Sequence, residues 1–454
     1  MIIELQNFGP IKSFKFDTDK DIHAIFGKNN IGKSYAISAV YLILKNLKFS
    51  EFQDFTALRE ARKEFENIVL EKTRNDTSKI VNIKNEVEKN LVRVFKNLIM
   101  DGINKSLKNS FPFENIQNKK GKGLLKIVLY FSKVKIIIML DSQKQQLEVV
   151  EVICDIDFEV KRNQFRKAVD FINDKIILYL NNKDQSIEDI KYCDVYVTDM
   201  LEEDLSNSFR DIFFLPASRS GLYTTLNSFG AVFAELARSR IVLTSKIEIP
   251  SFSESISDYF LNLNNIDDSV ISETYSEYFE KIEKDILKGT IGFDKTTRKY
   301  HYVPDNKPDM RFDLSSTSSM ISEIAPIIAH LKYIIPLQNE TPSILFIEEP
   351  EAHLHPEIQI LLLEYFVKLS KGNLKIVMTS HSNYIFNKLS NMVISKEISP
   401  DRLSVSLMKM TPEGSIVEEG AMHMDEYGIE DDNFVDVAEQ LYEERIKLLE
   451  NINQ

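Results

Sequence analysis

Residues 27–34 read GKNNIGKS and match GxxxxGK[ST], the pattern of a phosphate-binding loop (P-loop). The apolar residues 23–26, HAIF, predict a strand before the loop, and residues 35–44, YAISAVYLIL, predict a helix after it. The glycines let backbone N–H groups turn towards a phosphate, and the helix N-terminus adds partial positive charge. The alternative is a glycine turn capped by a serine, but the strand and helix around the loop favour nucleotide binding.

Within the P-loop, Lys33 is expected to reach the β- and γ-phosphates, and the Ser34 hydroxyl is expected to hold Mg²⁺. The predicted cofactors are therefore ATP and Mg²⁺. The predicted nucleotide-binding residues of the loop are Gly27, Asn29, Asn30, Gly32, Lys33 and Ser34.

A second polar cluster follows two apolar segments far along the chain. Residues 343–349, SILFIEE, predict a buried parallel strand that ends in two carboxylates, Glu348 and Glu349. Glu348 is predicted to bind Mg²⁺, and Glu349 to deprotonate the attacking water. A strand that ends in solvated acids is the alternative. The next predicted strand, in residues 374–382, ends at His381, which is expected to touch the γ-phosphate; the predicted catalytic residues are thus Lys33, Glu349 and His381.

Length, composition and charge limit the class of protein. The 454 residues are 43% hydrophobic, which is ample for a core, and the net charge of -13 argues against a protein that coats nucleic acid by bulk charge. No apolar run approaches the roughly 18 residues of a membrane span. Cys154 and Cys193 form neither a disulfide framework nor a metal knuckle. We therefore expect a soluble, cytoplasmic protein without a membrane partner.

The organisation along the chain suggests a divided site. About 315 residues separate Lys33 from Glu348, so a large insertion is expected between the two halves of an α/β P-loop fold. The predicted domains are an N-terminal lobe with the P-loop (1–50), a helical and β-meander insertion (51–210), the rest of the head (211–400), and a C-terminal hairpin and helix (401–454).

Two smaller features keep more than one interpretation. A basic run beside the meander is either a solvated loop or a contact to nucleic-acid phosphate, and it contains Lys119, Lys120, Lys122 and Lys126. His353 and His355 have the spacing of a metal pair, but no third or fourth ligand is spaced to complete it.

The order of these motifs resembles the ABC-type ATPase heads, which include the SMC-like, Rad-fifty-like and overcoming-lysogenization-defect (OLD)-like proteins. The resemblance is carried by FIEEPEAHLHP at 346–356 and TSHS at 379–382. LPASRSGL at 215–222 is similar to a segment of stand-alone ATPases of bacterial anti-phage systems such as Septu, PARIS and the retron-linked operons. The resemblance covers residues 1–48, 211–240 and 310–395.

The resemblance implies a fold and further site residues. It implies a mixed β-sheet flanked by helices, with residues 314–320, LSSTSSM, as the signature that closes over the ATP of a second copy through Ser318 and Ser319. A flexible helix cap is the alternative for these serines. The family usually has glycine where Met320 stands, and many heads have aspartate where Glu348 stands. These heads have a loop with a glutamine that senses the γ-phosphate, and we find no certain glutamine for it in this sequence. Ser218 and Arg219 stand at its place in the order of motifs.

By resemblance, the chain is expected to hydrolyse ATP in a head-to-head homodimer. A higher oligomer is the alternative assembly. It would act as the sensor or regulatory subunit of an anti-phage defence system whose separate effector protein is expected to be a nuclease. DNA or a phage component is a further candidate partner. The alternatives are an SMC-like DNA-repair or DNA-end-binding ATPase, and a scaffold that uses ATP to hold the dimer with little hydrolysis.

Overall fold

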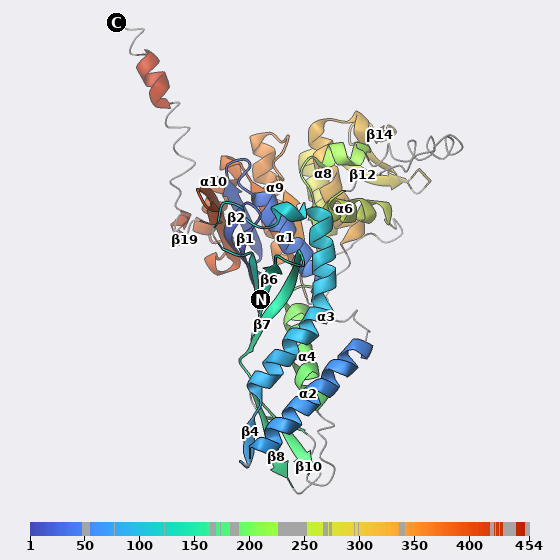
Figure 1. Ribbon diagram of the computed structural model, residues 1–454. Coiled ribbons are helices and arrows are strands. Elements are labelled where there is room, and N and C mark those ends of the chain that lie inside the picture. The colour runs from blue at the N-terminus through green and yellow to red at the C-terminus, as the bar shows by residue number, and fades with distance from the viewer. Residues whose placement is uncertain are drawn as a thin grey trace, which may run out of the picture.

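The computed structural model describes residues 1–47, 55–76, 78–121, 123–163, 169–172, 174–181, 190–225, 252–266, 271, 275–294, 296–297, 299–335, 341–417, 422, 424–425, 427–429 and 442–449. A large sheet of 11 strands organises the head (Figure 1). In spatial order its strands are β11 (Ile212–Leu215), β15 (Ser343–Glu348), β16 (Leu374–Ser380), β3 (Ile22–Gly27), β17 (Leu403–Thr411), β18 (Gly414–Val417), β2 (Ile11–Asp17), β1 (Ile2–Phe8), β5 (Lys126–Tyr130), β6 (Val134–Asp141) and β7 (Gln146–Cys154).

Five neighbouring strands, from β11 to β17, run parallel. Their apolar runs are buried on both faces, and every residue of β16 is buried. Because the strands point the same way, β3, β15, β16 and β11 all end at one edge of the sheet. This edge carries the P-loop, the two glutamates, His381 and the 216–220 loop, and it is where an open α/β sheet binds ligands.

Helices cover both faces of this parallel half. Successive residues of β15 alternate between two hydrophobic cores: Ile344 and Phe346 enter one, Leu345 and Ile347 the other. The first core is covered by α1 (Lys33–Asn46) and α3 (Lys84–Ser110), the second by α8 (Ser319–Ala329), α9 (Pro356–Lys371) and α10 (Asn383–Ile394). The predicted α/β fold, a mixed sheet flanked by helices, is confirmed.

The other half of the sheet is largely antiparallel. Strands β1 and β2 form the expected hairpin around Gly9 and Pro10, and β17 and β18 form the expected hairpin around 411–414. The meander expected in the insertion forms β5, β6 and β7, which continue the same sheet beyond β1. Strand β17 pairs directly with the P-loop strand β3, so the C-terminal region contributes to the centre of the head.

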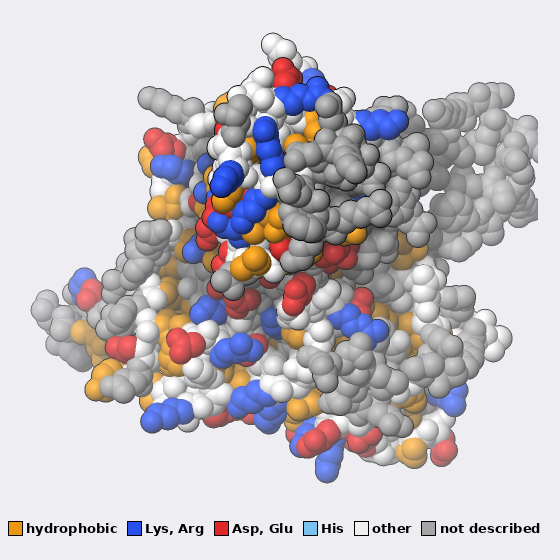
Figure 2. Space-filling view, turned by 90° about the horizontal axis from the view of Figure 1, so that it is seen from below, with side chains coloured by type: hydrophobic (Ala, Val, Ile, Leu, Met, Phe, Trp, Pro, Cys, Tyr) orange, Lys and Arg blue, Asp and Glu red, His pale blue; other side chains and the backbone are white. Residues whose placement is uncertain are grey.

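An arm projects from the head (Figure 1). It contains α2 (Phe55–Asn75), most of α3, α4 (Lys191–Ser208), and a second sheet in the order β4 (Ile80–Asn82), β8 (Asp157–Asn163), β10 (Lys175–Asn181) and β9 (Val169–Ile172). Arg62 of α2 pairs with the buried Asp194 of α4 at 2.7 Å. Seen from the arm side, the described lysines and arginines are interspersed with acids and hydrophobic side chains (Figure 2).

A smaller unit precedes the signature segment. It comprises α6 (Glu254–Asn264), α7 (Ser276–Ile282) and the three strands β12 (Gly289–Asp294), β13 (Lys299–Pro304) and β14 (Phe312–Asp313). At the other end of the chain, β19 (Met424–Asp425) pairs with β20 (Gly428–Ile429), and residues 442–449 are helical. Within the described ranges, no helix combines the length and the apolar character that crossing a membrane requires.

Candidate nucleotide-binding site

The P-loop connects β3 to α1 and depends on its two glycines. Gly27 has φ 142° and Gly32 has φ 94°, and both values disfavour residues with a side chain. A Cβ on Gly27 would lie 2.6 Å from the carbonyl oxygen of Met408 on the neighbouring strand β17, so the loop also lacks space there. Asn29 and Asn30 are exposed at the loop. The loop therefore presents its backbone at the N-terminus of α1, where a phosphate would bind.

Lys33, the first residue of α1, points back under the loop. Its Nζ donates to the carbonyl oxygens of Gly27 (2.9 Å) and Lys28 (3.0 Å) and lies 2.8 Å from Nε2 of His381. Burial lowers the Lys33 pKa to about 8, against the opposing effect of Glu349 and Glu351. The ammonium group is held in a partly dehydrated place where a bound phosphate would strengthen its charged form.

Ser34 and Glu348 come together although they lie on different elements. The Ser34 hydroxyl donates to the Glu348 carboxylate, and the backbone N–H of Ala217 donates to Glu348 Oε2 at 3.1 Å. Burial raises the pKa of Glu348, while these two donors oppose the rise. A hydroxyl beside a carboxylate is the hard oxygen donor set that suits Mg²⁺, so the residues fit the predicted ion.

Glu349 sits directly after the strand in an unusual backbone conformation. Its φ is 43°, which non-glycine residues rarely adopt, and its N–H donates to the carbonyl oxygen of Thr379 at 3.1 Å. The conformation turns the side chain towards β16, where Glu349 Oε1 lies 3.5 Å from His381 Nε2. Burial and the nearby Lys33 charge lower the His381 pKa, which favours the neutral imidazole. Lys33, Glu349 and His381, predicted from separate segments, thus lie together.

Sequence reasoning missed Glu351 as part of this arrangement. Its Oε1 accepts hydrogen bonds from the backbone N–H of His381 (2.6 Å) and the Ser380 hydroxyl (2.8 Å), and burial raises its pKa. Glu351 therefore fixes the end of β16 and with it the position of His381. The signal in the sequence is a third carboxylate, two residues after Glu349.

The Arg219 side chain, which stands where the order of motifs places the γ-phosphate-sensing loop, is fully buried. Its donors go to backbone carbonyls, including that of Glu348 at 2.8 Å. The guanidinium group therefore stabilises the backbone at the end of β15, where the two glutamates lie.

The hydrogen bonds of Ser318 and Ser319 are made within their own helix, α8. Ser318 caps α8 and accepts a hydrogen bond from the Ile321 N–H at 3.4 Å, while Ser319 is the first residue of that helix. Both serines are exposed. They form a helix N-terminus that faces outward, which suits contact with a separate molecule.

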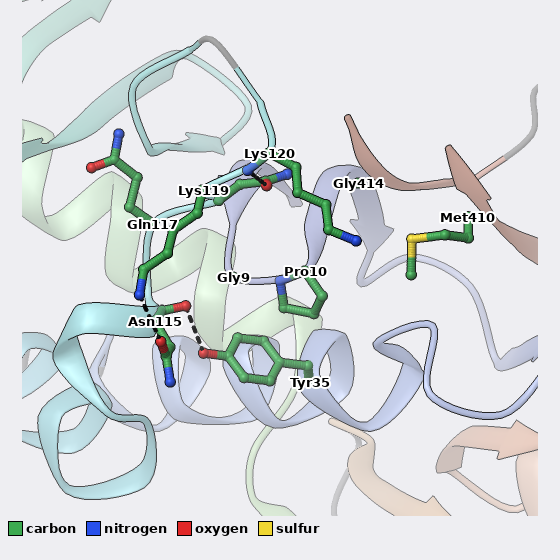
Figure 3. Close-up of a pocket in the computed structure, with 10 residues that line it drawn as sticks. Gly9, Pro10, Tyr35, Asn115, Gln117, Lys119, Lys120, Met410 and Gly414 are labelled. Atoms are coloured by element: carbon green, nitrogen blue, oxygen red, sulfur yellow. Dashed lines mark hydrogen bonds between the residues drawn. The ribbon is translucent and has the colours of Figure 1, made fainter. Parts of the chain in front are cut away.

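A hollow of about 280 Å³ is lined by Tyr35, the residue directly after the P-loop (Figure 3). Tyr35, which follows Ser34, forms one wall and donates to the Asn115 carbonyl oxygen at 3.3 Å. Pro10 forms another wall and packs close to Gly32. Lys119 and Lys120 of the predicted basic run line the rim, whereas Lys122 lies outside the described residues.

The metal pair considered for His353 and His355 gains no further ligand. Among the described residues, no group of three or more His, Cys, Asp or Glu side chains is arranged to hold a metal ion. Both histidines are exposed.

The strand order and the convergence of these side chains define an ABC-type P-loop ATPase head. The family model described as "AAA ATPase domain" matches residues 1–386, so the chain belongs to that family. A curated relative, "Endonuclease GajA" of Bacillus cereus (strain HuB5-5), is 28% identical over 159 residues, which are 30% of this chain and 23% of the relative. The aligned segment thus spans about a quarter of that relative's length.

Several solved SMC heads are also similar. The SMC head bound to the C-terminal winged-helix domain of ScpA has a TM-score of 0.39 and 10% identity, covering 92% of this chain and 96% of that one. The SMC head of Thermotoga maritima has a TM-score of 0.34 and 10% identity, covering 92% and 98%. The assignment of the fold rests on the strand order of this chain itself.

Proposed function

We propose that this chain hydrolyses ATP with Mg²⁺. The observation that carries the proposal is the convergence of Lys33, Glu349 and His381 next to the paired Ser34 and Glu348. A carboxylate beside a neutral imidazole at the end of a P-loop sheet is suited to orient a water and take its proton.

Each residue has a separate task in this proposal. Lys33 exchanges its carbonyl partners for the β- and γ-phosphates, and Ser34 and Glu348 hold Mg²⁺, which when bound offsets phosphate charge. Glu349 accepts the proton of the attacking water. His381, fixed by Glu351, donates a hydrogen bond towards the γ-phosphate. The strained backbone at Glu349 supports this assignment, because strain persists where the surroundings enforce it and is frequent at active sites.

The hollow lined by Tyr35 is proposed to receive the nucleobase and ribose. Tyr35 offers a ring that is tilted against Phe111, with ring centroids 4.2 Å apart, and its position one residue after Ser34 matches the reach of a nucleotide. Lys119 and Lys120 at the rim add positive charge where ATP would enter.

A second copy of the chain is proposed to complete the site. The exposed serines at the N-terminus of α8 offer N–H groups and hydroxyls to an anion, and the ATP of another copy would supply it. We assign the dimer to an anti-phage defence system in which it senses or regulates, and a separate effector supplies nuclease activity. The residue-level resemblance to defence ATPases and the partial similarity to an endonuclease support this assignment.

The experiment combines biochemistry with infection. The purified chain is assayed for Mg²⁺-dependent ATP hydrolysis, and the gene with its neighbours is tested for protection of a bacterial host against phage, beside a Lys33→Ala version. Hydrolysis together with protection that is lost in Lys33→Ala is the expected result. Hydrolysis without protection, together with salt-sensitive binding of DNA ends, would favour the DNA-repair alternative instead.

A further inference from the structure

A buried ion pair links the acidic strand end to the signature helix. Arg219 and Glu323 are both fully buried, and Arg219 Nε lies 3.3 Å from Glu323 Oε2. Removing two charges from water is expensive, and a hydrophobic pair often serves stability as well. Stability alone therefore does not account for the pair, which connects the 218–220 loop to α8.

The guanidinium group holds two elements of the head at once. Its Nη1 donates to the carbonyl oxygen of Glu348 at 2.8 Å, and its Nη2 to that of Glu349 at 3.3 Å. Its Nε donates to the backbone carbonyl of Glu323 at 3.1 Å. One planar group thus binds the backbone of both predicted site glutamates and the body of α8.

The same helix carries the exposed serines. Glu323 lies one turn after Ser319, and its Oε1 accepts hydrogen bonds from the Ser220 hydroxyl (2.6 Å) and the Ser220 N–H (3.3 Å). Ser218, just before Arg219, has φ 55°, so the loop that presents Arg219 is held in a defined and strained shape. A shift of α8 would therefore pull on the 218–220 loop and on the end of β15.

The network also contains unused hydrogen-bonding capacity. In the described part of the chain, the Tyr259 hydroxyl is buried without a hydrogen-bond partner, while Glu323 Oε2 has the ion-pair contact with Arg219 Nε but no hydrogen bond. The Tyr259 ring stacks on His330, the residue that follows α8 directly, with ring centroids 5.9 Å apart. A buried donor without a partner, on a ring packed at the end of α8, can gain a hydrogen bond after a small movement of that helix.

We propose that Arg219 is a positioning residue that couples the signature helix to the catalytic carboxylates of the same chain. A second copy that binds at Ser318 and Ser319 shifts α8, and Arg219 transmits the shift to the backbone of Glu348 and Glu349. In the reverse direction, ATP at the P-loop shifts α8. This coupling rests on the proposed function, since it needs ATP at the P-loop.

The test uses the full chain with Arg219→Met and Glu323→Gln combined. This double variant removes both charges and leaves an acceptor for Ser220, so no buried charge is left unpaired. Hydrogen exchange is measured with and without ATP and Mg²⁺, at a concentration where light scattering shows a monomer, so that a second copy cannot cause the change. The matched control is Lys332→Met with Glu283→Gln, which removes a largely buried pair between the segment just after α8 and the end of α7.

In the wild type and the control, ATP is expected to change exchange in α1 (33–46) and, by about threefold or more, in α8 (319–329). In the double variant only α1 responds, and kcat falls about 100-fold while KM changes little. Arg219→Lys is expected to restore little, because an ammonium group cannot span the same acceptors. An α8 response retained in the double variant, or absent from the wild type, would overturn the coupling. Absence of the α1 response in every protein would instead overturn ATP binding itself.

Discussion

Lys33 Nζ lies 2.8 Å from His381 Nε2, across 348 positions of sequence. The contact exists because β3 is inserted between β16 and β17, which brings the ends of two distant strands side by side. In this arrangement Lys33 is already satisfied by two carbonyl oxygens and the imidazole. Binding of ATP must therefore replace existing hydrogen bonds, and the protonation of Lys33 decides how favourable that exchange is.

The first prediction concerns the pH dependence of ATP binding. Without nucleotide the Lys33 pKa is about 8, and bound phosphate raises it, so binding takes up a proton above that pH. Because Lys33 is charged below pH 8, its titration should leave the dissociation constant for ATP unchanged there. Above pH 8 the dissociation constant should rise by about tenfold per pH unit. Calorimetry in buffers of different ionisation enthalpy measures both the affinity and the proton uptake. In Lys33→Arg, residual binding should lack this dependence; an equal pH profile in both proteins would refute the assignment.

The second prediction concerns the exposed serines of α8. Ser319→Arg should abolish ATP-dependent dimers, because the long arginine side chain would fill the space where the proposal places another copy's phosphate. ATP binding by the isolated chain should change by no more than about twofold, since Ser319 lies outside the P-loop cluster. Light scattering of Glu349→Gln proteins with ATP measures dimer formation. Asn306→Arg, an exposed position before β14, is the matched control, and loss of dimers in both variants would remove support for a signature role.

The third prediction tests the hollow lined by Tyr35. Tyr35→Ala should weaken ATP binding by about tenfold, the effect of losing one aromatic contact, while the affinity for inorganic triphosphate stays the same. Tyr35→Phe keeps the ring and loses only the hydrogen bond to Asn115, so it should bind ATP nearly as the wild type does. Equal weakening of ATP and triphosphate by Tyr35→Ala would indicate a damaged P-loop and no nucleobase contact.

The fold and the elements around the site follow closely from the sequence. Residues 27–34 lie between a strand and a helix as predicted, and residues 343–348 and 374–380 form the expected buried strands. These predictions succeed because each depends on a short, local pattern of apolar residues and turns. The catalytic and metal-binding roles of the clustered side chains stay predictions.

Other parts could not be read from the sequence because they depend on distant pairings. The hollow is built from the turns at Pro10 and Gly414 and from the 115–120 segment, which only strand pairing brings together. Arg219 has the place of the γ-phosphate-sensing residue in the order of motifs, but no local pattern shows that its side chain donates to the backbone carbonyls of Glu348 and Glu349. The role of Glu351 likewise depends on the pairing of β15 with β16.

The central claim is that Glu349 takes the proton of the attacking water. The direct measurement is single-turnover ATP hydrolysis by wild type and Glu349→Gln, with Glu357→Gln as the matched control at an exposed position on α9. We predict that Glu349→Gln binds ATP as the wild type does but hydrolyses it about 10²–10⁴-fold more slowly, whereas Glu357→Gln is unaffected. Equal hydrolysis rates for wild type and Glu349→Gln would contradict the account and favour a chain that uses ATP only to hold its dimer.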